Sequence, residues 1–516
     1  MPSEAAKQAY ARLLYDLDRR VFYRHPYEDK FVSSTRDDWL SELEAAADAA
    51  AYVADPSPQI DIPKVGWHTR PGLALSLRDQ FVYHYVALKA VPVLLPLMEW
   101  SAASVRFSYR LARAGKTWFE KEFQGWRNFD KVSLGKISGG AKHVLVSDIA
   151  GYYENIDIGR LILELQAARV DKSACDQLSA LWNKWCGVRG KGIPQGYSPS
   201  HVFGEFYLDP IDRALTSMGI DHVRYLDDIR VFSRSAVDAR RALHELSRLL
   251  RDRGLNLQSA KTEILTAAKS RKAFSAVHAS VRSVGRRIAD ELMRLAREGD
   301  YIHPDDIALV LRTDPDDPPP EVVERAWRSF VDGELAFNKT LFHYLLGRLA
   351  QIRSGGAVEW SVDLLQARPE ETYHVLAHLT DVQDQVPAAT LDRLAVLLGG
   401  DALLYDYQRY LILAWFHRLQ LRHAGVTAVA RRLSGANVTP LVRAHAIAYL
   451  GEHGEGIADT QRLERGLQNE TSELMRATYL YALRRAPDPT RNHWYGRCLG
   501  ESRLVDQAIG LGRRGD

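Results

Sequence analysis

The sequence predicts an α+β domain followed by an all-α domain built from repeated helices. Strand and helix patterns alternate between residues 60 and 265, whereas no strand pattern follows residue 270. In the helical half, residues 442–450 align with residues 475–483 at a spacing of 33. Residues 409–416 lie one further period upstream, with residue 409 placed 34 residues before its match at 443. Helix pairs of this length stack into an α-solenoid.

Composition indicates a soluble protein long enough for several domains. The 516 residues are 46% hydrophobic and 26% charged, and the net charge of +3 neither demands nor excludes nucleic acid. The three cysteines show neither a CxxC pair nor a zinc spacing, so we expect no disulfide framework and no structural zinc. The N-terminus lacks a signal-peptide pattern, and the most apolar window, residues 86–98, is short and contains Lys89. We therefore expect a cytoplasmic protein that does not cross a membrane.

The first 140 residues predict helices around one pair of strands. Residues 1–50 have helical periodicity, and residues 81–97 predict a buried helix. Between them, residues 60–64 alternate as a strand, and a second strand is expected to reach residue 79. Lys64 and Arg70 place cations on these strands that could grip a polyanion; solvated cations on an ordinary hairpin are the alternative.

The elements that follow alternate in type. A short apolar strand leads to Asp148, and residues 158–165 follow at helical spacing. After a glycine-flanked loop, Ser198 and Pro199 predict the N-cap and first position of a helix that Pro210 should kink or end. A last strand is expected at residues 255–257.

Residues 222–232 predict a β-hairpin with Asp227 and Asp228 at its turn. Adjacent carboxylates repel each other when they are partly buried, and a cation between them removes that cost. Hard divalent cations such as Mg²⁺ bind carboxylate oxygens together with substrate phosphates and water. A solvated turn is the simpler explanation of the pair alone, but Asp148 at the end of another strand predicts that three carboxylates meet across one sheet. Such a cluster suits phosphoryl transfer.

The order of these segments resembles motifs A to D of reverse transcriptases. The segments are Asp148-Ile149-Ala150-Gly151-Tyr152-Tyr153, Gly192-Ile193-Pro194-Gln195-Gly196, Tyr225-Leu226-Asp227-Asp228, and Gly254-Leu255-Asn256-Leu257 with Lys261-Thr262. Upstream, Ile62-Pro63-Lys64, Arg70-Pro71, Arg78-Asp79 and Ser108-Tyr109-Arg110 are similar to the fingers motifs of bacterial members. The resemblance implies a polymerase right hand, with N-terminal helices and fingers over 1–140 and a palm over 141–270. A helical connector and Pro-rich linker over 271–320 and an α-helical repeat domain, similar to HEAT repeats, over 321–516 complete the predicted architecture.

The resemblance also implies a set of metal ligands and a reaction. Asp148 and Asp227 would bridge two Mg²⁺ ions, with Asp228 as the third carboxylate and the Ile149 carbonyl as a backbone ligand; Mn²⁺ is an allowed substitute. The reaction would be nucleotidyl transfer, an in-line displacement at the α-phosphate of a dNTP. Leu226 is bulkier than the alanine common at this position in bacterial members, which leaves the packing of the primer end open.

Five further residues receive roles only through the resemblance. Tyr153 would be the steric gate that excludes the 2′-hydroxyl of NTPs, and Gln195 would lie beside the incoming nucleotide. Lys64 and Arg70 would grip the triphosphate, and Lys261 would protonate the departing pyrophosphate as a general acid. The alternatives are a core aromatic for Tyr153, a backbone-bonded loop glutamine for Gln195, and surface ion pairs for the fingers cations.

No RNase H, integrase or HNH-nuclease signature follows the predicted palm. A reverse transcriptase with only a helical-repeat tail resembles the abortive-infection and unknown-group bacterial enzymes that act in antiphage defence. The expected partners are dNTPs and DNA or RNA, with a non-coding RNA and a homo-oligomer formed through the helical domain as further candidates. A reverse transcriptase of a mobile element and a decayed polymerase acting as a helical scaffold are the competing interpretations. Template use and the nature of the primer stay open.

Overall fold

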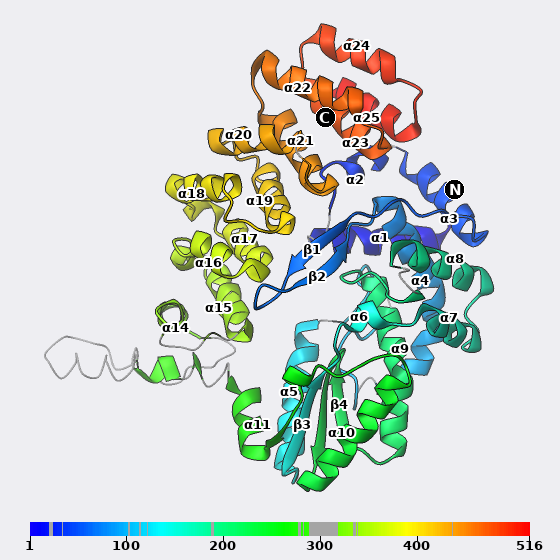
Figure 1. Cartoon of the computed structure of the whole chain (residues 1–516), viewed down its shortest axis with the longest axis vertical. Coiled ribbons are helices and arrows are strands. Elements are labelled where there is room, and N and C mark those ends of the chain that lie inside the picture. The colour runs from blue at the N-terminus through cyan, green and yellow to red at the C-terminus, as the bar shows by residue number, and fades with distance from the viewer. Residues whose placement is uncertain are drawn as a thin grey trace, which may run out of the picture. The chain divides into compact units, whose positions relative to one another are not determined.

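The computed structural model divides the chain into two compact units, each considered by itself (Figure 1). The first unit comprises Met1–Arg24, Glu28–Gln59 and Gly72–Phe274, and the second comprises His25–Tyr27, Ile60–Pro71 and Ser275–Asp516. The residues that the structure describes are 1–19, 24–33, 35–101, 104–112, 115–120, 122–186, 190–276, 280–281, 283–287, 318–333, 337, 339–435 and 437–515. Most of the predicted Pro-rich linker therefore lies outside the described residues.

The first unit contains a four-stranded antiparallel sheet. Its strands are β3 (His143–Asp148), β4 (His222–Tyr225), β5 (Asp228–Ser233) and β6 (Glu263–Thr266), in the order β4-β5-β3-β6. The hairpin predicted at residues 222–232 is confirmed as β4 and β5, paired from His222 opposite Val231 to Tyr225 opposite Asp228. The central strand β3 pairs with β5 on one side and with β6 on the other.

Helices cover both faces of this sheet (Figure 1). On one face, α5 (Glu122–Ser138) and α11 (Ala267–Phe274) enclose an apolar cluster. Its buried members are Phe107, Phe129, Ile137, Val144, Val223 and Phe232. Successive side chains of a strand point to opposite faces, so Leu145 and Val231 point away from this cluster. Helix α10 (Ala236–Arg251) packs against β3 and β5 and covers that second face with an apolar stripe.

The remaining helices of the first unit form its N-terminal part and the flank of the sheet. They are α1 (Glu4–Arg19), α2 (Glu28–Ser33), α3 (Arg36–Asp48), α4 (Leu77–Met98), η1 (Glu99–Ser101), α6 (Tyr152–Asn155), α7 (Ile158–Ala167), α8 (Lys172–Trp185), α9 (Ser198–Ser217) and η3 (Ser259–Lys261). The helical prediction for residues 1–50 is confirmed by the described residues. Helix α4 is longer than expected, and the segment Leu77–Ser101 is long and apolar enough to cross a membrane by length and composition alone. It packs against α1, α3, α8 and α9, with 56% of its apolar window buried, as core helices do.

Two predicted boundaries around α4 and α9 are wrong. The strand β2 (Thr69–Leu73), which pairs with β1 (Gln59–Pro63), stops well before residue 79 because Ser76 caps α4 by accepting a hydrogen bond from the Asp79 backbone N–H. Ser198 is not the N-cap of α9; that position is Tyr197, whose hydroxyl donates to the Leu73 carbonyl (2.5 Å). This tertiary anchor shifts the start of the helix by one residue.

Two further expectations concern the chain beyond this point. The helix that Pro210 should kink or end does not end there: α9 continues to Ser217 with Pro210 inside it, and the Trp100 indole holds Asp209 at 2.8 Å. Residues 255–257 do not form a strand; only an isolated bridge joins Leu257 to Ile149.

The second unit is built mainly from helices in the described residues. They are α14 (Pro320–Val331), α15 (Lys339–Gln351), η4 (Gly355–Ala357), α16 (Ser361–Ala367), η5 (Pro369–Glu371), α17 (Thr372–Asp381), η6 (Gln383–Gln385), α18 (Ala388–Gly399), α19 (Asp406–Arg418), α20 (Ala424–Leu433), α21 (Pro440–His453), α22 (Gly456–Asn469), α23 (Glu473–Ala482), η7 (Leu483–Arg485), α24 (Asp488–Cys498) and α25 (Arg503–Arg514). Helices α19, α21 and α23 begin at residues 406, 440 and 473, which reproduces the predicted period. Each packs on the next, and α23 packs on α25.

Two short N-terminal segments belong to this helical unit. The Tyr27 hydroxyl donates to the Ala448 carbonyl of α21 (3.1 Å), and the Tyr27 ring meets the Tyr481 ring edge-on. In the β1–β2 hairpin, the Trp67 carbonyl accepts from the Tyr405 hydroxyl at 2.9 Å. Segments that precede the sheet in sequence are thus part of the helical fold.

Candidate active site

Three aspartates converge at one end of the central strand pair. Asp148 ends β3 and lies directly opposite Asp228, which begins β5. Opposite residues of an antiparallel pair present their side chains on the same face, where like charges destabilise the sheet. Asp227 precedes Asp228 in the two-residue turn that links β4 to β5. The strand register therefore brings together the two halves of the carboxylate set that lie about eighty residues apart in sequence.

The turn holds a backbone conformation that its residues do not favour. Leu226 has a φ of +54°, as the first position of a tight two-residue hairpin turn requires, although glycine, asparagine or aspartate usually fills it. Backbone bonds secure the ends of the turn: the Ile149 N–H donates to the Asp227 carbonyl at 3.2 Å, and the Gln258 N–H donates to the Asp148 carbonyl at 2.7 Å. Strain of this kind persists where surrounding contacts enforce it and is frequent at functional sites.

The carboxylates have little positive charge to balance them. Burial, with the neighbouring Asp228 and Asp148, raises the pKa of Asp227 to about 7, and burial with Asp148 raises the pKa of Asp228 to about 6. Lys261 forms an ion pair with the Asp148 carboxylate. Although partial burial acts to lower the pKa of Lys261, this pairing raises it above its usual value. Three clustered carboxylates with a single ammonium at their edge are a donor set that suits hard divalent cations.

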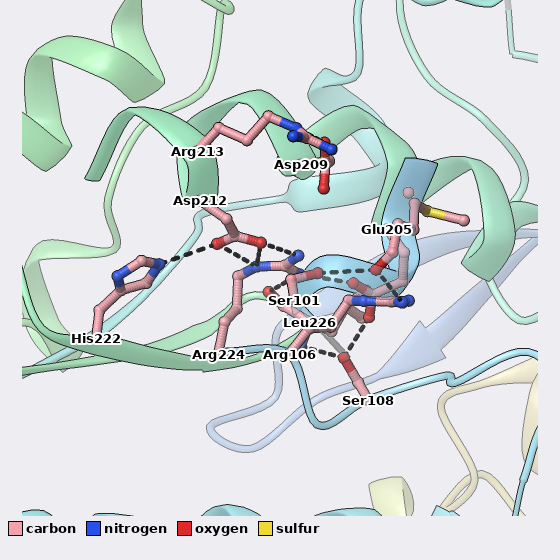
Figure 2. A network of polar contacts seen from close by, with 12 residues as sticks. Ser101, Arg106, Ser108, Glu205, Asp209, Asp212, Arg213, His222, Arg224 and Leu226 are labelled. Carbon is pink, nitrogen blue, oxygen red and sulfur yellow. Dashed lines mark hydrogen bonds and ion pairs between the residues drawn. The ribbon is translucent and has the colours of Figure 1, made fainter. Parts of the chain in front are cut away.

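A buried polar network lies behind the turn (Figure 2). At its centre is Arg224 of β4, which is 1% exposed. Its guanidinium binds both oxygens of Asp212, with a shortest contact of 2.6 Å, and contacts Glu205 at 2.8 Å. Both acids lie on α9, and His222 approaches Asp212 at 3.3 Å. Although burial opposes ionisation, Arg224 and His222 lower the pKa of Asp212 to about 2.

This network contacts the turn directly. Arg224 donates to the Leu226 carbonyl at 3.1 Å, and the Leu226 N–H donates to the Ser108 hydroxyl at 2.7 Å. Ser108 in turn hydrogen-bonds Glu205 (Figure 2). Both backbone groups of the strained residue are thereby satisfied by buried side chains. Ser108 lies in a segment similar to a fingers motif, whereas no pattern in the sequence indicates a role for Arg224, Glu205 or Asp212.

Tyr153 lies on α6, the short helix that follows Asp148 after a reversal at Gly151 (φ +54°). The tyrosine is 3% exposed, and its hydroxyl hydrogen-bonds the His201 imidazole. His201 stacks on Tyr109 with ring centroids 3.9 Å apart. Burial raises the pKa of Tyr153 well above its usual value. Its ring is therefore fixed in position, as both a core aromatic and a gate require.

The other predicted site residues have different surroundings. Gln195 is half-buried in the loop before α9, and its side chain makes no hydrogen bond within the described part of the chain. Lys64 is exposed, and its backbone N–H donates to the His68 carbonyl at 2.7 Å. Lys64 and the half-buried Arg70 belong to the second unit, separate from the unit that carries the carboxylates. Their roles, like that of Lys261, stay predictions.

The match to one family model agrees with the palm geometry. Residues 103–288, about a third of the chain, match the family model described as reverse transcriptase (RNA-dependent DNA polymerase). No curated protein gives a significant match. Among solved structures, a telomerase from Candida albicans in complex with a TWJ fragment of telomeric RNA matches at 10% identity and a TM-score of 0.32, over 92% of this chain and 70% of that one. The chain thus contains a reverse transcriptase domain, and its enzyme class is RNA-directed DNA polymerase, a nucleotidyltransferase.

Proposed function

We propose that this chain is a Mg²⁺-dependent reverse transcriptase that adds dNTPs to a primer in antiphage defence. One observation carries the catalytic part: the register that sets Asp148 opposite Asp228, with Asp227 in the adjoining turn. Three carboxylates held this way on rigid strands cost stability unless they bind a cation. The matched family model supports the polymerase chemistry.

The residues present fit the metal that this chemistry needs. Asp148 and Asp227 would bind two Mg²⁺ ions, with Asp228 and the Ile149 carbonyl as further oxygen ligands, and Mn²⁺ would bind the same oxygen set. When bound, such ions stabilise negative charge on the entering 3′-oxygen and on the departing pyrophosphate. Burial and the neighbouring carboxylates raise the pKa values of Asp227 and Asp228, and a divalent cation bound between these carboxylates would relieve that repulsion.

The chain's own side chains would position the nucleotide. The Tyr153 ring, held by His201, would lie against the sugar and exclude a 2′-hydroxyl. Gln195, whose amide has no partner among the described residues, would hydrogen-bond the nucleotide. Lys64 and Arg70 would bind the triphosphate. Lys261 would leave Asp148 and donate a proton to pyrophosphate, for which an ammonium close to carboxylates is well placed.

The test of catalysis is dNTP incorporation by the purified full chain on primed templates with Mg²⁺. We expect incorporation by the wild-type chain and none by the variant that combines Asp227→Ala with Asp228→Ala. Because the nature of the primer is open, reactions with a DNA primer, with an RNA primer and without a primer are run in parallel. Activity that survives the double substitution would refute the metal assignment.

The gate is tested by sugar selectivity rather than by overall rate. Tyr153→Ala should admit ribonucleotides, whereas Tyr153→Phe keeps the ring, loses the bond to His201 and should still discriminate. Equal dNTP preference in the wild type and in the alanine variant would show that Tyr153 is only a core aromatic.

The biological role rests on the architecture of a polymerase palm with a helical tail. We propose that the helix pairs at a period of 33 to 34 residues are HEAT-like repeats, that the enzyme works in the cytoplasm, and that the helical unit binds a non-coding RNA or a second copy of the chain. The decisive measurement is plaque formation on a host that carries the gene. Fewer plaques with the wild-type gene, and normal plaque numbers with the Asp227 and Asp228 double variant, would support defence. Equal plaque numbers with and without the wild-type gene would exclude it.

A further inference from the structure

A cluster of two histidines and a glutamate lies in the helical unit. His343 comes from α15, Glu371 ends η5, and His374 lies in the first turn of α17. One ligand atom from each side chain lies within 4.8 Å of the other two. Helices α15 and α17 pack against each other although η4, α16 and η5 lie between them in sequence, so the cluster joins two helices that are neighbours only in the fold.

Glu371 is the most constrained member of the cluster. The residue is fully buried, with an exposed fraction of 0%. Its Oε2 lies 2.5 Å from the His343 Nε2, whereas its Oε1 makes no hydrogen bond and has only Lys339 at 3.5 Å. A buried carboxylate oxygen without a hydrogen bond is costly, and such groups in native structures call for a missing partner such as an ion.

The two imidazoles are also arranged in a way that favours a metal. The ring centroids of His343 and His374 are 3.8 Å apart, so protonating both rings would place two positive charges in contact. Neutral imidazoles are the form that binds metals. The His343 Nε2 donates to the Glu371 carboxylate, and a neutral His374 has one ring nitrogen with a lone pair in the same cluster.

We propose that His343, Glu371 and His374 bind one divalent transition-metal ion, with zinc as the preferred metal. Two imidazole nitrogens and one carboxylate oxygen are a known zinc donor set that leaves a fourth position for water. Tetrahedral zinc with bonds near 2.1 Å separates its ligand atoms by about 3.3 Å. The 2.5 Å contact between His343 and Glu371 would open and the longer separations would close, which small rotamer adjustments achieve.

Lys339 is compatible with this site. Its side chain is 54% exposed and can turn toward solvent, and it faces the oxygen that His343 does not contact. Once Lys339 turns toward solvent, Oε1, the oxygen without a hydrogen bond, is available to the metal. No cysteine is needed, so the spacing of cysteines in the sequence gives no indication of this site.

The metal would connect the two helices in the middle of the unit that carries the β1–β2 hairpin. Because this site and the palm carboxylates use different ligand types, they select different metals: imidazole nitrogen suits zinc, and an all-oxygen set suits Mg²⁺. Zinc binding in the helical unit is therefore separable from catalysis.

The experiment uses the full chain without an affinity tag, stripped with EDTA and dialysed against Zn²⁺ or Co²⁺. The wild-type chain should retain one zinc per chain after gel filtration, and the Co²⁺ form should absorb in the visible range as four-coordinate cobalt does. His343→Asn and His374→Asn should each lower the affinity at least tenfold. A wild-type chain that retains no zinc and shows no cobalt band would overturn the proposal, whether or not the variants fold.

Two control variants sharpen the result. His423 pairs with Asp392 at 3.0 Å in the same unit, but among the described residues it belongs to no group of three possible metal ligands. His423→Asn should therefore leave the zinc content at one per chain. The combined Asp227→Ala and Asp228→Ala variant should also retain its zinc, which separates this site from the palm. Zinc lost equally from His423→Asn and His374→Asn, or zinc retained by both cluster variants, would contradict the assignment.

Discussion

Two clusters of buried carboxylates lie close together in the first unit and differ in how their charge is balanced. Behind the turn, Asp212 and Glu205 face the guanidinium of Arg224, and the pKa of Asp212 falls to about 2. At the turn, the aspartates face one another, and the pKa of Asp227 rises to about 7. Burial raises the pKa in both places; the sign of the neighbouring charge decides the outcome.

The difference separates two uses of buried charge. The Arg224 network satisfies its own charges and fixes backbone groups of Leu226, so its contribution is structural order. The carboxylates of the turn leave negative charge unbalanced, which is unfavourable in the isolated protein and favourable once a cation binds. Substitutions in each cluster test whether buried charge stabilises the fold behind the turn and binds a cation at the turn.

Asp228→Asn should have the largest effect, and it should act in opposite directions on activity and stability. Removing one metal ligand should lower dNTP incorporation about a thousandfold, equivalent to about 4 kcal/mol of transition-state stabilisation. Removing one of two like charges opposite each other should raise the free energy of unfolding without Mg²⁺ by about 0.5 kcal/mol. Primer extension and urea denaturation measure the two effects.

Asp130→Asn is the matched control for this substitution. Asp130 is another acid on the α5 side of the sheet, but it pairs with Arg230 at 2.8 Å and lies outside the proposed metal set. Its removal should leave incorporation within about twofold and should not stabilise the protein. If Asp228→Asn, like Asp130→Asn, failed to raise the free energy of unfolding, repulsion between the clustered carboxylates would not destabilise the protein.

Arg224→Met should destabilise the first unit by about 3–5 kcal/mol, because it leaves Asp212 and Glu205 buried without a counter-charge. Urea denaturation followed by tryptophan fluorescence measures the loss. Arg213→Met is the control: Arg213 also pairs with an aspartate of α9, Asp209, at 2.6 Å, but it is half-exposed and should contribute less than about 1 kcal/mol (Figure 2).

A second substitution distinguishes lost charge balance from lost packing. Adding Glu205→Gln to Arg224→Met removes one of the stranded charges and should recover part of the stability. If the double variant is less stable than Arg224→Met, packing of the arginine stem rather than charge pairing dominates this network.

The carboxylates of the turn were accessible from sequence, and the network behind them was not. Alternating apolar residues around adjacent aspartates predict a hairpin from local information alone. Arg224, by contrast, meets acids 12 and 19 residues away on α9. One signal was available: Glu205 and Asp212 are seven residues apart, so they share one face of a helix whose other residues are largely apolar.

Element boundaries were predicted less well where tertiary contacts decide them. The cap at Ser76 ends the extended segment before α4, and the anchor of Tyr197 on the Leu73 carbonyl sets the start of α9. The Tyr197 anchor depends on a partner that no local pattern specifies. The Ser76 cap is local, because the Asp79 N–H lies three residues further on, at the spacing of an N-cap and its N3 residue. The helix period in the second half was predictable because repeats with similar packing need similar sequence, whereas the His343, Glu371 and His374 cluster requires knowledge of which helices pack together.

Ser108→Ala should destabilise the first unit less than Arg224→Met does and should have a selective effect on activity. Its hydroxyl accepts from the Leu226 N–H at 2.7 Å, so the alanine leaves that buried donor unsatisfied at a cost of about 1–3 kcal/mol. Because Leu226 adjoins Asp227, a loosened turn should lower dNTP incorporation about tenfold while the KM for dNTP changes little.

Ser101→Ala provides the comparison, since Ser101 is equally buried but its hydroxyl bonds only the Met98 carbonyl among the described residues, at 3.1 Å and away from the turn. It should lose a similar or smaller amount of stability and keep full incorporation. A kcat loss in Ser108→Ala that Ser101→Ala does not share would show that the network positions the carboxylates. Equal activity in both variants would confine the network to stability, and the turn would then hold its strained conformation through the strands alone.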